Sequence, residues 1–190
     1  CSNLPDRLVG HLTRLRTEPT VSFMILTLTL SLSFAIPMGV IAAWKHGTII
    51  DRAVMMTAVF GFSTPSFVVG YLLAYIFALQ LDWLPVQGFT SITVGLIPFL
   101  RNLILPATAL GLVFMALIAR ITRATMLDVL SQDYVRTAKA KGVGQRGVLF
   151  VNALKNAAVP IVKIVGSGFA ALIGGAIVNE REFAMPGLGR

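Results

Sequence analysis

Four long apolar segments dominate this sequence of 190 residues. Each carries at most one charged residue, and together they occupy residues 19–44, 53–81, 102–122 and 156–179. A helix that crosses the hydrocarbon core of a membrane needs about 20 mainly apolar residues. Only 13% of all residues are charged, about half the share of a soluble domain. The sequence therefore predicts an all-α polytopic membrane protein with four visible spanning helices.

The basic residues between these segments predict their orientation. The first connection carries Lys45 and Arg52, and residues 120–155 carry seven basic residues against two acidic ones. Because basic residues gather on cytoplasmic loops, we expect the first and third connections to be cytoplasmic. Residues 1–18 are then external, although three arginines among them weakly oppose this orientation. Basic cytoplasmic loops therefore account for the net charge of +8, and binding to nucleic acid is not needed to explain it.

Two interruptions of the apolar pattern need local explanations. Pro65, between Ser63 and Ser66, is expected to kink the second segment or to start a helix; lining of a pathway by exposed backbone carbonyls is the second interpretation. Residues 92–100 are apolar but too short to span, so we expect a separate interfacial or re-entrant helix there.

The sequence lacks the patterns that mark common enzyme sites. Its two histidines are far apart, and no cluster of histidine, cysteine and carboxylate residues has metal-ligand spacing. No nucleophile-elbow or Walker-type phosphate motif is present. The glycines at 166–175 lie in an apolar segment, where small residues allow close helix packing. We expect no catalytic residue, no metal site and no cofactor bound by this chain.

Residues 133–142, Asp-Tyr-Val-Arg-Thr-Ala-Lys-Ala-Lys-Gly, predict a short helix on the cytoplasmic side. Asp133 suits a helix start, both as a cap and through its charge. Alanines and long basic residues favour helix as far as Lys141, and Gly142 is a natural stop. Because a helix this short buries little surface by itself, we expect it to contact lipid headgroups or a partner protein.

These ten residues resemble the cytoplasmic EAA loop of ABC importer permeases, in the form typical of the peptide/nickel subgroup. Further segments similar to this subgroup lie at residues 63–67, 83–85, 154–160, 174–176 and 186–190. The resemblance extends from about residue 19 to residue 190. Two departures from the general family pattern are typical of the subgroup: Arg136 replaces the motif's glutamate, and Pro160 comes 18 residues after Gly142.

The resemblance implies a type I ABC importer transmembrane domain over residues 19–190, after an external segment at residues 1–18. A full subunit of this family has about six spans, so we expect one further span before these four and one after them. The implied function is to form half of the translocation pathway for short peptides in the bacterial cytoplasmic membrane. Nickel or another small solute is the alternative cargo.

The resemblance also implies the partners of this chain. They are a second homologous permease subunit, two cytoplasmic ABC ATPases that bind ATP and Mg²⁺, and an external solute-binding protein. In this family the short helix couples the membrane domain to an ATPase. The residues that match it are Asp133, Tyr134, Arg136, Thr137, Ala138, Lys139, Lys141 and Gly142.

A second set of residues is a candidate for the pathway or its outer gate: Ser63, Pro65, Ser66, Glu180, Phe183, Pro186 and Gly187. Glu180 has two interpretations. It either contacts a peptide amine or the binding protein, or it stabilises the local structure through hydrogen bonds. Lys163, where the family has a small or apolar residue, is interpreted as a lysine that reaches the headgroups rather than as a substrate ligand.

Other interpretations remain open from the residues alone. The basic stretch around residues 133–142 could be an ordinary solvated loop, as positive cytoplasmic charge predicts. A secondary transporter would show inverted repeats and charged sites at the membrane midplane, and no repeat is visible. A membrane-anchored scaffold would not need the pattern at 134–142. Cys1 marks a fragment boundary or, alternatively, a lipid-modified terminus.

Overall fold

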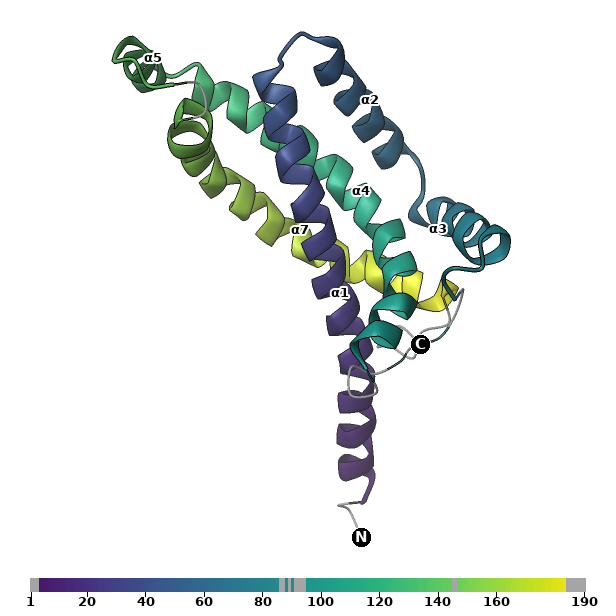
Figure 1. Ribbon diagram of the computed structural model, residues 1–190. Helices are drawn as coiled ribbons and strands as arrows, with labels where there is room; N and C mark the ends of the chain where they lie inside the picture. The colour runs from purple at the N-terminus through teal and green to yellow at the C-terminus, as the bar shows by residue number, and fades with distance from the viewer. Residues whose placement is uncertain (1–3, 86–87, 89, 91–94, 145–146, 184–190) are drawn as a thin grey trace. The chain divides into compact units, whose positions relative to one another are not determined.

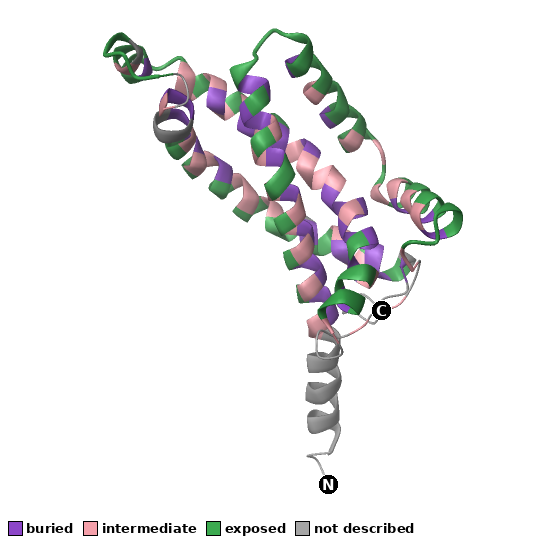
Figure 2. Ribbon diagram, in the orientation of Figure 1, coloured by how far each residue is buried: buried purple, intermediate pink, exposed green. Residues whose placement is uncertain are grey.

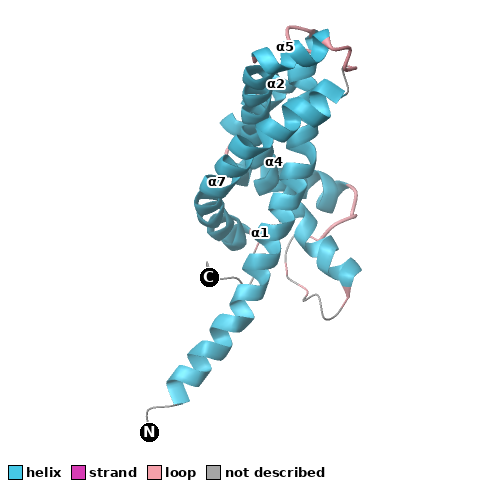
Figure 3. Cartoon of the chain, turned by 90° about the vertical axis from the view of Figure 1, so that its left-hand side faces the viewer, coloured by secondary structure: helices cyan, strands magenta, loops and turns pink. Residues whose placement is uncertain are grey.

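The computed structural model describes residues 4–85, 88, 90, 95–144 and 147–183. Every regular element within these ranges is helical, and none of them contains a strand (Figures 1 and 3). The all-α prediction is thereby confirmed. In chain order the elements are α1 (Leu4–Trp44), α2 (Ile49–Ser63), α3 (Ser66–Ala74), the π-helical η1 (Tyr75–Gln80), α4 (Leu96–Leu130), α5 (Asp133–Ala140), the π-helical η2 (Val148–Ala153) and α7 (Leu154–Glu182).

Two helices are by themselves long and apolar enough to cross a membrane, namely Thr17–Trp44 within α1 and Leu96–Leu130. Two further candidates are bent helix pairs: Ile49–Ser63 with Ser66–Gln80, and Leu154–Ala170 with Leu172–Arg181. The described residues therefore supply two spans, or up to four if each bent pair crosses as one. This range includes the four spans predicted from the apolar segments.

The second apolar segment is interrupted at the predicted proline. α2 ends at Ser63 and α3 begins at Ser66, with Pro65 directly before it at φ −58°. Proline has no amide hydrogen and its ring clashes with the preceding turn of a helix. The Pro65 carbonyl accepts hydrogen bonds from the amides of Val68 and Val69, at 3.0 and 3.3 Å, so α3 starts anew from this residue.

The expectation of a separate short helix at residues 92–100 is wrong for its described part. Residues 96–100 form the first turns of α4, whose first bond joins the Phe99 amide to the Gly95 carbonyl at 3.2 Å. Pro98 lies in this first turn, where an amide hydrogen has no partner within the helix anyway. Nothing between Leu96 and Arg101 therefore stops the helix, and it continues into the predicted span.

The chain forms two compact units, which we describe separately. The first comprises residues 1–30, 64–112 and 171–190, and the second comprises residues 31–63 and 113–170. In the first unit the fully buried side chains include Phe23 of α1, Leu103 and Leu105 of α4, and Leu172 of α7. Each comes from the apolar part of its helix, and the remaining faces are exposed (Figure 2).

The core of the second unit combines alanines with larger apolar side chains. Ala43 of α1, Met126 of α4, and Ala153 and Ala157 near the start of α7 share one buried cluster. Small residues let helix backbones approach closely in a membrane. At Gly39 of α1 the approach is closest, because a Cβ there would lie 2.6 Å from Thr122 Cβ and 2.7 Å from the carbonyl oxygen of Ala119 on α4.

This contact predicts that Gly39→Ala destabilises the protein. We expect the free energy of unfolding to fall by about 1–3 kcal/mol, since overpacking a tight core costs about that much. Gly166→Ala is the matched control, because a Cβ at this α7 position meets no described atom within 4 Å. Thermal unfolding of the purified protein in detergent measures both changes. Equal unfolding temperatures for the two variants would contradict a tight crossing of α1 and α4.

Candidate functional site

The short cytoplasmic helix is present as α5, from Asp133 to Ala140. Asp133 is its first residue, so its charge lies at the positive end of the helix dipole. The amides of Val135 and Arg136 donate to the carbonyl of Gln132, at 3.0 and 3.3 Å. The capping position therefore belongs to Gln132, and the expectation that Asp133 itself caps the helix is corrected to a role through charge.

Gly142 ends α5 through its backbone geometry. Its φ is +82°, a left-handed conformation that side chains with a Cβ rarely adopt. The Val143 amide then donates to the carbonyl of Ala138 at 3.2 Å, as in a Schellman motif. The glycine stop predicted from the sequence is thus confirmed.

One side of α5 is attached to the helical segments that follow it. Val135 is fully buried, and α5 packs against η2. The Tyr134 hydroxyl accepts a hydrogen bond of 3.0 Å from the amide nitrogen of Asn156 on α7. The sequence places Val135 with Tyr134 and Ala138 on a small apolar face of this helix, but it does not reveal which segment packs against that face.

The other predicted residues of α5 remain on its surface. Asp133, Arg136, Thr137, Lys141 and Gly142 are exposed, as Figure 2 shows for most of this helix. Tyr134 is about half-exposed and Ala138 is partly buried; the side chain of Lys139 lies outside the described part of the structure.

A shallow cavity of about 400 Å³ lies along α5 and the turn after it. Five residues line it, and four of them belong to the predicted set: Tyr134, Thr137, Ala138 and Lys141, with Val143. Its wall combines an aromatic ring, short side chains and one cation. Such a surface can receive a small apolar side chain with an acidic or hydrogen-bonding neighbour.

An ion pair that the sequence did not predict lies in the second unit, which also contains α5. Asp51 of α2, whose side chain is only 5% exposed, pairs with Arg123 of α4. Both carboxylate oxygens accept from the guanidinium, through Nε and through Nη2, the latter at 2.7 Å. The Gly47 amide also donates to Asp51, at 3.0 Å, and His46 Nδ1 lies 3.1 Å from the carboxylate. The pair thus joins the turn between α1 and α2 to α4.

The candidate gate residues are divided between the two units. Ser63 ends α2 in the second unit, whereas Pro65, Ser66, Glu180 and Phe183 belong to the first unit. Pro186 and Gly187 lie outside the described residues.

Within the first unit the end of α7 lies beside α3. The Asn179 amide nitrogen is 3.4 Å from Ser66 Oγ, and an aromatic carbon of Phe183 lies 3.1 Å from where a Cβ of Gly70 would be. The fold therefore places α3, which begins at Ser66, beside the end of α7 and Phe183.

Glu180 is fully buried in this unit and accepts a hydrogen bond from the Thr20 hydroxyl of α1 at 2.5 Å. Its burial favours the hydrogen-bonding role that the sequence left open beside ligand contact. In the ranges that the structure describes, no three histidine, cysteine, aspartate or glutamate side chains converge as metal ligands would.

Comparison with known proteins gives consistent results. The model of a family described as "Binding-protein-dependent transport system inner membrane component" matches residues 35–190. The probable peptide ABC transporter permease protein y4tP of Sinorhizobium fredii is 50% identical over 175 residues, which is 92% of this chain and 56% of that protein.

Two further relatives cover similar shares. A putative peptide transport system permease protein of Brucella abortus is 41% identical over 92% of this chain and 56% of its own length. The glutathione transport system permease protein GsiC of Escherichia coli is 41% identical over 92% of this chain and 55% of its own length. The chain thus spans about half the length of the curated relatives it matches.

The ion pair of Asp51 and Arg123 predicts a measurable coupling. Asp51→Asn and Arg123→Gln should each lower the free energy of unfolding by about 1–3 kcal/mol, the usual range for a hydrogen bond to a charged group. The double variant should lose less than the sum, because both changes remove the same interaction. Arg52→Gln, at an exposed neighbouring arginine, should change stability by less than about 0.5 kcal/mol. Additive losses in thermal unfolding would show that the two side chains are not coupled.

Proposed function

Because this chain belongs to the family of binding-protein-dependent transport system inner membrane components, we propose that it forms half of the membrane pathway of an ATP-driven importer of short peptides. Its place as a multi-pass protein of the inner membrane follows from the family and from the two to four candidate spans. Short peptides are supported as cargo by the relatives, which are described as peptide and glutathione permeases; glutathione is itself a tripeptide.

The geometry of α5 is the observation that carries the proposal. One face of this helix is fixed by buried Val135 and by the bond from Asn156 to Tyr134. Beside this face lies a cavity, which Tyr134 also lines together with exposed Thr137 and Lys141. A partner seated at this cavity would therefore displace α5 together with the start of α7, rather than deform a flexible loop.

In the proposed mechanism the ATPase subunits bind ATP and Mg²⁺, and this chain supplies a docking helix and a pathway. Closure of the ATPases moves α5, and the packed helices change between two discrete arrangements. The ion pair of Asp51 and Arg123 keeps the α1–α2 turn attached to α4 during this movement. A second permease subunit completes the pathway, and an external binding protein delivers the cargo.

The docking role predicts a difference between two alanines of α5. Ala138 lines the cavity, whereas Ala140 is exposed outside it. Ala138→Glu places a charge where an apolar contact is expected, and an unpaired buried charge is strongly unfavourable. We expect it to reduce recovery of the ATPase with the purified permease, and peptide uptake, by about tenfold or more. Ala140→Glu adds the same charge and should leave both near the wild-type level.

Normal ATPase recovery and normal uptake with Ala138→Glu would rule out docking at this cavity. Peptide uptake that continues without any ATPase subunit, driven by an ion gradient, would instead identify a secondary transporter. If the intact system takes up a different class of solute, the proposal that short peptides are the cargo is wrong, whereas the proposed docking of the ATPase on α5 is unaffected.

A further inference from the structure

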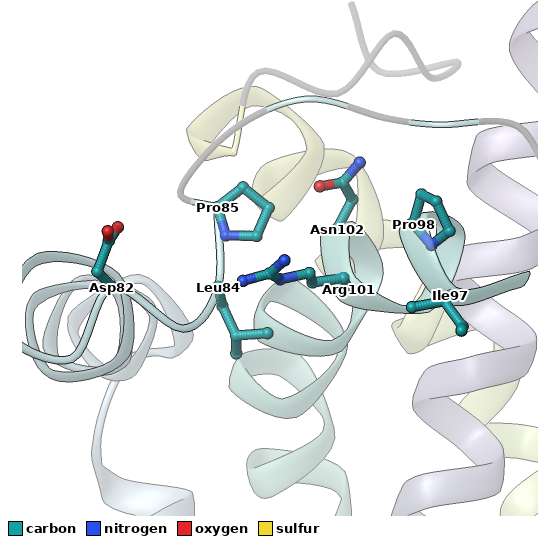
Figure 4. A pocket seen from close by; sticks show the side chains of 7 residues that line it. All are labelled: Asp82, Leu84, Pro85, Ile97, Pro98, Arg101 and Asn102. Atoms are coloured by element: carbon teal, nitrogen blue, oxygen red, sulfur yellow. The ribbon is translucent and has the colours of Figure 1, made fainter. Parts of the chain in front are cut away.

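A second cavity, of about 450 Å³, lies in the first unit between the segment after η1 and the first turns of α4 (Figure 4). Its volume is within the range of pockets that bind small molecules. Leu84 and Ile97 contribute apolar walls, and Asp82, Arg101 and Asn102 contribute polar groups. The alternation of the predicted spans places this connection on the external side of the membrane.

Arg101 is held in the cavity by its inner nitrogen. Nε donates to the carbonyl oxygen of Trp83 at 2.8 Å, so the plane of the guanidinium is fixed. Figure 4 shows the guanidinium extending from α4 toward Leu84. Its terminal nitrogens form no ion pair with any described residue. A guanidinium held in this way presents donors with the geometry that matches a carboxylate.

Asp82 supplies the opposite charge from the other wall. Its φ of +49° turns the chain sharply after η1, a conformation that aspartate tolerates better than most residues. The turn is fixed because the amides of Trp83 and Leu84 both donate to the Phe77 carbonyl, at 2.9 and 3.3 Å. No ion pair joins Asp82 to a described cation, so a carboxylate and a guanidinium line the same cavity without neutralising each other.

Asn102 adds an uncharged acceptor, on the side of Arg101 that faces away from Asp82 (Figure 4). Its amide nitrogen donates to the Thr90 hydroxyl at 2.6 Å, which leaves its carbonyl oxygen as an acceptor. The other described lining residues, Leu84, Pro85, Ile97 and Pro98, have apolar side chains. This cavity is therefore suited to a ligand that has one anionic end and one cationic end, with an N–H near the anionic end.

We propose that this cavity is an external subsite for a short zwitterionic peptide, in which Arg101 binds the free carboxylate and Asp82 binds the free ammonium group. The apolar walls accept side chains of different shapes, so recognition depends on the two termini. This inference rests on the proposed function in peptide import, and it adds a site at which peptides are recognised by this chain itself.

The test compares peptides that differ only at one terminus. The assembled transporter, reconstituted in lipid nanodiscs without its binding protein, is titrated with dialanine, its C-terminal amide and its N-acetyl derivative, and binding is followed by saturation-transfer NMR. We expect the amide to bind about tenfold more weakly than dialanine, since it lacks a charge-assisted contact. Arg101→Gln should weaken dialanine to the affinity of the amide and leave the amide itself unchanged. Asp82→Asn should weaken dialanine to the affinity of its N-acetyl derivative and leave the affinity of the N-acetyl derivative unchanged.

Two controls separate recognition from a structural role. Arg101→Lys keeps the charge and should retain part of the preference for the free carboxylate. Arg120→Gln, at an exposed arginine elsewhere on α4, should change none of the affinities. The subsite is overturned if wild-type transporter binds no dialanine, or if Arg101→Gln weakens dialanine and its amide equally. Peptide uptake by the wild-type system is measured in parallel, and its absence would refute the proposed function separately.

Discussion

The hydrocarbon core of a membrane offers no hydrogen-bond partner to a backbone amide, and this constraint governs the whole chain. A spanning segment must satisfy its own backbone, so an apolar run forms a helix. Polar side chains inside the helices follow the same requirement. Thr27 and Thr57, for example, donate their hydroxyls to carbonyls one turn earlier, at 2.8 and 2.9 Å. At Pro65, where the helix is interrupted, the proline's own carbonyl accepts two amides of the next helix.

The same requirement makes each buried polar pair a fixed point between helices. In one unit, Asp51 is buried against Arg123, which joins the α1–α2 turn to α4. In the other unit, the Thr20 hydroxyl of α1 bonds to fully buried Glu180 of α7. Apolar packing alone is compatible with sliding of one helix along another, whereas a hydrogen bond to a buried charge is satisfied at one position only.

Exposed polar groups, by contrast, mark where this chain is available to other molecules. α5 buries Val135, whereas its charged residues Asp133 and Arg136 are exposed. The connection between η1 and α4 holds Asp82 and Arg101 apart across a cavity. α5 and Asp82 lie outside the long apolar helices, and Arg101 lies near the start of α4, so loss of hydration penalises these charges little. The proposed docking and peptide-recognition surfaces therefore occur where the chain can carry unpaired charge at low energetic cost.

Much of the fold could be predicted because its determinants are local. The apolar runs predicted the long helices, Pro65 predicted the break after Ser63, and Gly142 predicted the end of α5. The start of α4 was missed because the charged Arg101 separates the short apolar run at residues 92–100 from the long one, whereas a helix continues through an arginine near its start. The candidate site was predicted less completely. The motif at residues 133–142 indicated α5 and its small apolar face, whereas the packing of this helix against η2 was not predicted.

The sequence by itself determined that this chain is helical, where the break at Pro65 and the end of α5 lie, which connections carry the positive charge and which family it resembles. These properties depend on residue polarity and on backbone preferences over a few neighbouring positions. Only the tertiary structure decided that Arg123 pairs with Asp51, 72 residues away, and that Glu180 is buried rather than exposed. The choice of partner depends on the rotation and register of packed helices, and these are fixed by contacts among residues far apart in the chain.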